Sequence, residues 1–189
     1  IRDRFYSVYF HRQHGLPTVR ARFQNVYGPG EYLGAGRWRG TPATIWRNVT
    51  PTFVFKALQK EPLPVENNGV ASRDFIFVED ICRGLMACAE KGKPGEVYNI
   101  ASGRETTILE LAELINSLTE NPSGVAFLPG RPWDHSGKRF GSTQKAAREL
   151  GFEALVNLRE GMERTITWTR KNLHVIEGCI DKHRHHLEE

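Results

Sequence analysis

Apolar residues recur along this chain with two alternating periods. Stretches with apolar positions three or four residues apart have the period of an amphipathic helix. Short runs rich in β-branched and aromatic residues lie between them and are typical of strands. Helices are expected over residues 3–14, 51–60, 80–91, 107–118, 142–150 and 157–173. Strands are expected over residues 18–26, 62–65, 75–78, 96–100 and 125–128. Strands that alternate with helices predict an α/β fold with a partly parallel sheet.

Local signals sharpen some of these boundaries. Thr107 and Glu110 have the spacing of a capping box at the start of a helix. Asp80 is expected to be the N-cap of the preceding helix, and Gly92 its C-cap. Residues 31–50 are rich in Gly, Arg and Trp without a clear period, which predicts a long, ordered loop of the kind that often carries function.

The composition excludes several classes of protein. With 39% hydrophobic and 25% charged residues, the chain has the make-up of a soluble globular protein. No apolar run approaches the roughly 20 residues that a membrane span needs. The net charge of +4 is too sparse for a nucleic-acid surface, which usually carries a dense basic stripe. We therefore expect a cytoplasmic protein with no membrane or nucleic-acid partner.

Neither the cysteines nor the histidines predict a metal site. The three cysteines have no Cys-x-x-Cys spacing and are expected to be free thiols in a reducing cytoplasm. His183, His185 and His186 lie in a C-terminal stretch without a core-forming pattern, where they would have no fixed geometry.

Several cations and amides lie where predicted strands run into loops. Arg22, Arg73 and Arg131 carry planar forks of donors suited to phosphate oxygens. Asn25 and Asn48 add neutral donors. Together these residues favour a site for a phosphorylated ligand.

The same residues have plainer interpretations. A single surface arginine is more often part of an ion pair worth little stability. Asn25 would also stabilise the turn that precedes Gly28. Asp134 would accept hydrogen bonds from ribose hydroxyls, although any other hydrogen-bond donor could also bind its carboxylate. Only the set as a whole supports the ligand hypothesis.

Six segments, in order along the chain, resemble the extended short-chain dehydrogenase/reductase family. This family includes the nucleotide-sugar epimerases, the 4,6-dehydratases and the UDP-glucuronate decarboxylases. Each segment alone is a weak signal, but the ordered set is a strong one, and it matches only the C-terminal half of such an enzyme. The segments span residues 16–29, 72–80, 97–103, 131–134, 149–152 and 160–168.

The resemblance implies an α/β fold: the C-terminal part of a Rossmann-type enzyme with its small α/β substrate-binding domain. Residues 1–30 would complete the Rossmann part. Residues 31–174 would form the nucleotide-sugar-binding region, from which the strand at 96–100 returns to the Rossmann sheet. Residues 175–189 would be a C-terminal tail.

The resemblance also implies two ligands, an NAD cofactor and a nucleotide-diphosphate sugar. Phe23 and Gln24 would border the nicotinamide of NAD. The diphosphate of the sugar nucleotide would be bound by Asn25, Arg73 and Arg131. The rest of the nucleotide would be contacted by Asn48, Val49, Val65 (near the base) and Asp134 (on the ribose).

Two motifs of the family are missing from this sequence. No tyrosine is followed four residues later by a lysine, so the Tyr-x-x-x-Lys acid–base pair is absent. The glycines between residues 28 and 40 lack the strand–loop–helix setting of a dinucleotide fingerprint. We assign no catalytic residue to this chain and expect it to be inactive alone. Both motifs would precede Ile1, so we expect a homodimer or association with a missing N-terminal half.

The leading functional hypothesis is the substrate-binding half of an NAD-dependent nucleotide-sugar epimerase similar to UDP-glucose 4-epimerase. A fragment of a nucleotide-sugar 4,6-dehydratase or of a UDP-glucuronate decarboxylase stays open. A non-catalytic nucleotide-sugar-binding module is an alternative of a different class.

Overall fold

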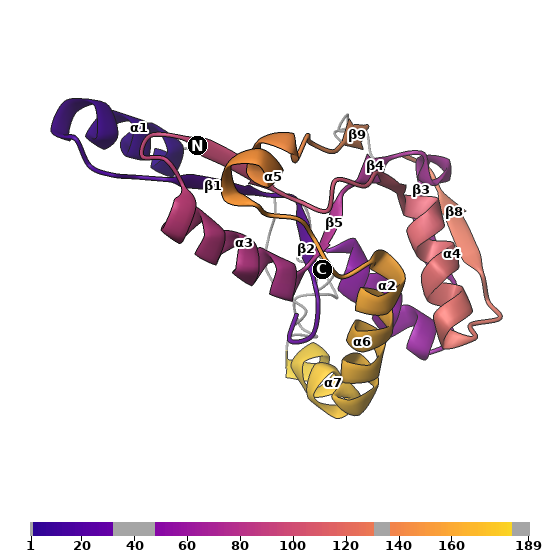
Figure 1. Ribbon diagram of the computed structural model, residues 1–189. Coiled ribbons are helices and arrows are strands. Elements are labelled where there is room, and N and C mark those ends of the chain that lie inside the picture. The colour runs from indigo at the N-terminus through magenta and orange to yellow at the C-terminus, as the bar shows by residue number, and fades with distance from the viewer. Residues whose placement is uncertain (1, 32–47, 131–136, 183–189) are drawn as a thin grey trace. The chain divides into compact units, whose positions relative to one another are not determined.

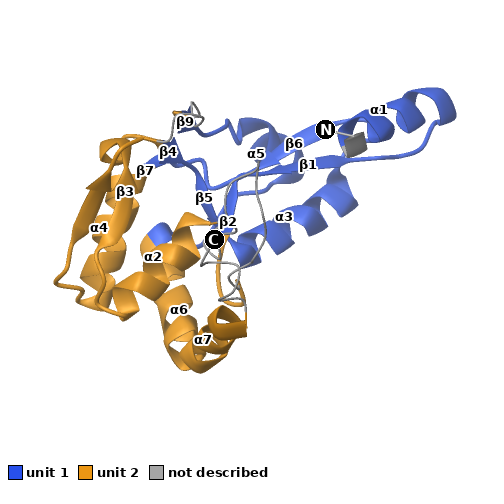
Figure 2. Cartoon of the chain, turned by 180° about the vertical axis from the view of Figure 1, so that it is seen from behind, with its two compact units in different colours: residues 1–26, 72–106, 138–158 blue, residues 27–71, 107–137, 159–189 orange. Residues whose placement is uncertain are grey.

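The computed structural model describes residues 2–31, 48–130 and 137–182 (Figure 1). Contacts divide the chain into two compact units that interleave along the sequence, as Figure 2 shows. Unit 1 comprises residues 1–26, 72–106 and 138–158, and unit 2 comprises residues 27–71, 107–137 and 159–189. The sequence suggested the segments 1–30, 31–174 and 175–189, with the strand at 96–100 returning to the first of them.

Unit 1 is a mixed α/β unit with short parallel strands. Strands β1 and β6 pair in parallel, with Phe23 opposite Ile100, and run side by side in Figure 1. Strand β2 pairs with β5, and β4 pairs in parallel with β9. The helices of the unit are α1 (Arg2–His14), α3 (Val78–Lys91) and α5 (Gln144–Leu150). The strands are β1 (Arg20–Phe23), β2 (Asn25–Tyr27, whose last residue belongs to unit 2), β4 (Ser72–Arg73), β5 (Phe75–Phe77), β6 (Val97–Ile100) and β9 (Lys138–Arg139).

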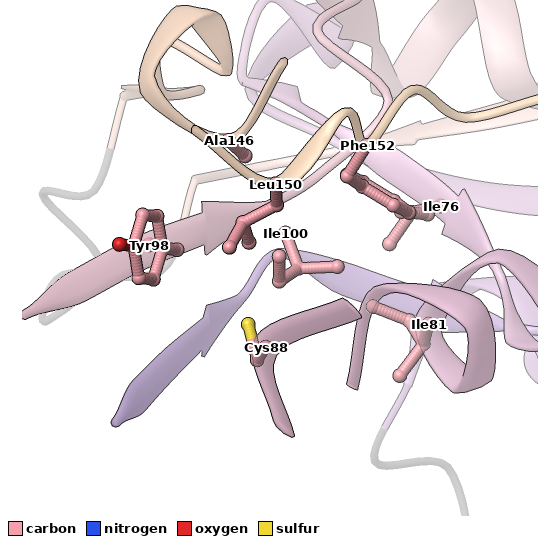
Figure 3. Close-up of a cluster of buried hydrophobic side chains, with 8 residues drawn as sticks. All are labelled: Ile76, Ile81, Cys88, Tyr98, Ile100, Ala146, Leu150 and Phe152. Carbon is pink, nitrogen blue, oxygen red and sulfur yellow. The ribbon is translucent and has the colours of Figure 1, made fainter. Parts of the chain in front are cut away.

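The core of unit 1 forms where α3 and α5 pack on β6. Figure 3 shows buried side chains from β5, α3, β6 and α5 gathered around Ile100. Gly84 permits this packing, because a Cβ there would clash with Cγ2 of Ile100 and lie 3.1 Å from Cε2 of Phe152. Each fully buried aliphatic side chain contributes about 1.5–3 kcal/mol to folding. The cluster comprises Ile76, Ile81, Cys88, Tyr98, Ile100, Ala146, Leu150 and Phe152.

Unit 2 is built on the parallel pair of β3 and β8, against which α2 and α4 pack. Alternate residues of β3, Leu63 and Val65, are fully buried, as the period of a half-buried strand requires. The elements of the unit are α2 (Val49–Leu58), β3 (Leu63–Glu66), the short 3-10 turn η1 (Asn67–Gly69), α4 (Ile108–Thr119), β8 (Val125–Leu128), α6 (Leu158–Lys171) and α7 (Leu173–Lys182). A two-residue strand β7 (Thr106–Thr107) lies where the chain passes from unit 1 to unit 2 and pairs with β4.

Most predicted elements are present. The short strands β4, β7 and β9 and the turn η1 were not predicted, and three predicted features differ from the structure. The strand expected at 18–26 is divided at Gln24, because β1 and β2 pair with different partners. Helix α3 begins at Val78 and takes Phe77 as its N-cap, so Asp80 is its third residue and not its cap. The buried carboxylate of Asp80 instead accepts a hydrogen bond from Val156 N (3.0 Å) and pairs with Arg83. The stretch from residue 175, which was expected to be a tail, contains most of α7, and this helix buries Ile176.

Candidate functional site

Asp74, directly after β4, organises the part of unit 1 that contains the predicted ligand residues. Its carboxylate is fully buried and accepts three hydrogen bonds, from Ser102 N (2.8 Å), Ser102 Oγ (2.7 Å) and Gly103 N (2.8 Å). Its main-chain oxygen accepts a fourth from Asn25 N (2.9 Å). Because a buried carboxylate is stable only when it is well hydrogen-bonded, this arrangement ties three separate segments into one fixed geometry.

Two of the predicted substrate residues, Asn25 and Arg73, are brought together by this arrangement. The main chain of Asn25 is bonded to the residue that follows Arg73. The half-buried guanidinium of Arg73 donates through Nη1 to the main-chain oxygen of Ser72 (2.7 Å). Asn25 in β2 and Arg73 in β4 are thus linked through the main chain at Asp74, and not by either side chain.

The two residues assigned to the cofactor, Phe23 and Gln24, lie at the carboxyl end of β1. In open parallel sheets, ligands bind at this end of the strands. Phe23 is 47% exposed, which leaves an aromatic face available to a planar ring. The position and exposure of Phe23 therefore fit a nicotinamide.

The Asn99 side chain, which no sequence motif singled out, also lies at this end of the unit. Its Nδ2 donates to Ser142 O (3.0 Å). A Cβ on Gly141 would lie 3.2 Å from Asn99 Nδ2 and 3.3 Å from Gln24 Nε2. The main chain at Gly141 therefore lies close to both side-chain amides. This contact could not be predicted from the sequence, because Gln24, Asn99 and Gly141 are far apart along the chain.

In unit 2, Asn48 and Val49 lie at the start of α2. Asn48 is exposed and occupies the N-cap position, yet its side chain makes no capping bond. Its Nδ2 instead donates to Glu31 Oε1 at 2.5 Å. Burial raises the pKa of Glu31, and the hydrogen bond from Asn48 acts in the opposite direction. The Asn48 amide is thus already placed against a carboxylate oxygen, the kind of acceptor that a phosphate also presents.

The side chain of Val65 is fully buried in unit 2. It faces the core beside Gly69, where a Cβ would approach Val65 Cγ1 to 2.8 Å. Any contact between Val65 and a nucleotide would therefore involve the main chain. Arg131, Asp134 and most of the predicted loop at 31–50 lie outside the described residues.

A second polar cluster in unit 1 surrounds Glu105. Ser72 Oγ donates to Glu105 Oε1 (2.5 Å), and Lys138 Nζ lies 3.4 Å from the same oxygen. The hydrogen bond from Ser72, with help from Lys138, lowers the pKa of Glu105. Lys138 and Arg139 form β9, which lies next to β4 and thus next to Arg73. No sequence pattern predicted this cluster, because its members are far apart along the chain.

Within the described ranges, no group of three or more His, Cys, Asp and Glu side chains is placed to hold a metal ion. The same part of the chain contains no helix with the length and apolar character to cross a bilayer.

Solved structures of similar fold share extensive sequence with this chain. The Bordetella bronchiseptica enzyme WbmF, solved in complex with NAD+ and UDP, is 67% identical, with a TM-score of 0.84 over 95% of this chain and 54% of that one. The UDP-glucose 4-epimerase of Thermotoga maritima, solved with UDP-glucose, is 32% identical, with a TM-score of 0.77 over 89% of this chain and 51% of that one.

Curated relatives are more distant. The dTDP-glucose 4,6-dehydratase of Streptomyces niveus is 33% identical over 167 residues, which cover 88% of this chain and 46% of that protein. Human dTDP-D-glucose 4,6-dehydratase is 30% identical over 169 residues. The chain spans about half the length of the curated relatives that it matches.

The family model for the NAD dependent epimerase/dehydratase family matches residues 6–101, just over half of the chain. These residues include Phe23 to Asn25, Arg73, Asp74 and Asn99, which belong to the candidate site in unit 1. The fold is accordingly the Rossmann-type α/β fold of the extended short-chain dehydrogenases, as the sequence suggested. This chain belongs to the NAD-dependent epimerase/dehydratase family.

Proposed function

We propose that this chain is the substrate-binding half of an NAD-dependent nucleotide-sugar epimerase and that it binds a nucleoside diphosphate sugar. The observation that carries the proposal is the arrangement in which Asp74 fixes Asn25 beside Arg73. A diphosphate needs several donors from different segments, and the guanidinium of arginine matches pairs of phosphate oxygens. Residues fixed before the ligand arrives lose little entropy on binding.

The other assigned residues would contact the remaining parts of the same ligand. In the proposal, Asn48 donates its amide to a phosphate, while Val49 and the main chain of Val65 line the nucleotide. Arg131 adds a second cation for the diphosphate, and Asp134 accepts from the ribose hydroxyls. Support for a uridine nucleotide comes from WbmF, which is 67% identical to this chain and was solved in complex with UDP.

NAD is the proposed cofactor, and when bound it supplies hydride transfer to and from the sugar. In this chain, the exposed aromatic face of Phe23 would support the nicotinamide at the carboxyl end of β1. Gln24 would present its amide beside it, held near Gly141. The sequence has no Tyr-x-x-x-Lys pair, so in the proposal the acid–base residues belong to another chain or segment. We propose association with a chain or segment that supplies those residues and, independently of them, with a second copy of this chain.

A nucleotide-sugar 4,6-dehydratase is the second candidate. It is favoured by the curated relatives, among which the dTDP-glucose 4,6-dehydratases of several organisms match at 28–33% identity. The epimerase is preferred because the structures of UDP-glucose 4-epimerase and of the Methanothermobacter thermautotrophicus epimerase Mth375 match at 32% and 43% identity.

Isothermal titration calorimetry on the 189-residue chain tests the binding proposal. UDP, dTDP and UDP-glucose are titrated into the wild type, into Arg73→Ala and into the control Arg170→Ala, which removes an exposed arginine of α6. Loss of a charged hydrogen-bond donor should weaken UDP binding by about 10- to 100-fold in Arg73→Ala. The control should bind as the wild type does. Equal UDP affinity in Arg73→Ala and wild type would refute the proposed site.

An activity measurement tests the assignment of the acid–base residues. The purified chain, incubated with NAD and UDP-glucose, should show no interconversion of the sugar. NAD-dependent turnover by this chain alone would show that the acid–base residues lie within it.

A further inference from the structure

Arg73 and Arg139 occupy paired positions on neighbouring strands. The parallel register of β4 and β9 places Ser72 opposite Lys138 and Arg73 opposite Arg139. Strands in a sheet are about 4.8 Å apart, and successive side chains point to opposite faces. The side chains of Arg73 and Arg139 therefore leave the sheet on one face, and those of Ser72 and Lys138 leave it on the other.

Contacts identify the two faces. Ser72 Oγ and Lys138 Nζ both reach Oε1 of Glu105, at 2.5 Å and 3.4 Å, so the face that they share is closed by a carboxylate. Arg73 and Arg139 then lie on the face that Glu105 does not occupy. Arg139 is exposed and Arg73 is half-buried.

We propose that Arg139 binds the diphosphate of the sugar nucleotide together with Arg73, an inference that rests on the proposed function. Two cations at paired positions of a sheet repel each other, and an anion with two negative charges relieves that repulsion. Guanidinium groups bind phosphate oxygens in a planar, two-point geometry, so one diphosphate has enough oxygens for both side chains. Lys138 is excluded from this role because it faces Glu105.

Lys138→Ala is the matched control for Arg139→Ala. Both substitutions remove one positive charge from exposed, adjacent positions of β9, but on opposite faces of the strand. UDP, UMP and uridine are titrated calorimetrically into the wild-type chain and into these two variants, together with Arg73→Ala. Arg139→Ala should weaken UDP binding by about tenfold, with little change for uridine, which has no phosphate. Lys138→Ala should change UDP affinity by less than about twofold.

The outcomes separate this inference from the proposed function. If Arg73→Ala weakens UDP binding and Arg139→Ala does not, the role of Arg139 is refuted and the proposed function stands. Equal losses in Lys138→Ala and Arg139→Ala would also refute it, because they would indicate a general effect of charge. If UDP does not bind the wild type, the proposed function fails and this inference fails with it. Arg139→Lys keeps the charge without the planar fork and should recover only part of the lost affinity.

Discussion

Asp74 shows how one side chain can determine the geometry of a site without contacting a ligand. Its carboxylate has three donors and no cationic partner among them, because two are main-chain amides and one is a hydroxyl. The pattern of donors depends on the loop after β6, which is distant in sequence and close in space.

Substitution of Asp74 is expected to destabilise the fold. Asp74→Ala would leave two buried amides and a hydroxyl without an acceptor, and we expect the free energy of unfolding to fall by about 3 kcal/mol. Asp74→Asn keeps one acceptor oxygen and should cost less. Urea unfolding monitored by circular dichroism measures both. The control Glu113→Ala, at an exposed position of α4, should stay within about 0.5 kcal/mol of the wild type. A loss in Asp74→Ala no larger than in this control would contradict the structural role.

The hydrogen bond from Asn48 to Glu31 gives a second prediction at the residue scale. Burial raises the pKa of Glu31 and the Asn48 amide opposes that shift, so Asn48→Ala should raise the pKa further. NMR titration of the Glu31 carboxyl carbon measures the change. Ser117→Ala, at an exposed position of α4, should leave the Glu31 pKa unaltered. A lower Glu31 pKa in Asn48→Ala would disprove the assignment.

The raised pKa of Glu31 determines how the contribution of this residue to folding stability changes with pH. The native state binds the Glu31 proton more tightly than the unfolded chain does, so this group favours folding at pH values below its ordinary pKa. That contribution is lost as the pH rises through the raised native pKa. In Asn48→Ala, this stabilising contribution of Glu31 should be lost at a higher pH, because the native pKa of Glu31 is raised further.

At the scale of elements, the approach of α3 to β6 depends on the missing side chain of Gly84. Gly84→Ala should destabilise the protein by about 1–3 kcal/mol, because the new methyl group would overpack the core against Ile100 and Phe152. Gly178→Ala is the control: it lies in α7 with no atom near the added Cβ, and alanine favours a helix. Thermal unfolding of the two variants should move in opposite directions. Equal midpoints would show that α3 can shift without cost.

Elements defined by local interactions were predictable from the sequence. The capping box is present in full: Glu110 N donates to Thr107 Oγ1 (3.1 Å), and Thr107 N donates to Glu110 Oε2 (2.7 Å). The division of the first strand at Gln24 was not predictable, because it depends on pairing with β6 and β5, which lie far along the chain. The same reason explains why Arg73 was identified and Arg139 was not. Arg73 lies in a recognisable motif, whereas Arg139 gains its place only from the register of two short strands.

At the scale of the whole molecule, α1 exposes more aromatic surface than a helix in water usually does. Phe5 is 69% exposed and Tyr6 60%, and Tyr9 and Phe10 extend the same side of the helix. The Tyr9 and Phe10 rings meet edge to face, with centroids 5.4 Å apart. Contiguous exposed aromatic side chains mark surfaces that bind another protein. This surface supports the proposed association with a second chain.

Sedimentation velocity tests that expectation. The wild-type chain should associate as its concentration rises, since burial of the α1 aromatic surface is favourable. The double variant Phe5→Gln, Tyr9→Gln should remain monomeric at the same concentrations. Phe140→Gln, which removes an exposed aromatic side chain elsewhere in unit 1, should behave as the wild type does. A wild-type chain that stays monomeric throughout would count against an α1 interface.

The register of β4 and β9 also affects how this region tolerates change. A shift of β9 by one residue would exchange the faces of Lys138 and Arg139. The face with Arg73 would then receive an ammonium group, and Glu105 would face a guanidinium. Because both residues are cations, the charge on each face would survive a strand slip or a one-residue insertion, whereas the planar two-point hydrogen bonding would not. In β9, the charge on each face therefore does not depend on the length of the preceding loop. The geometry of the hydrogen bonds does depend on that length.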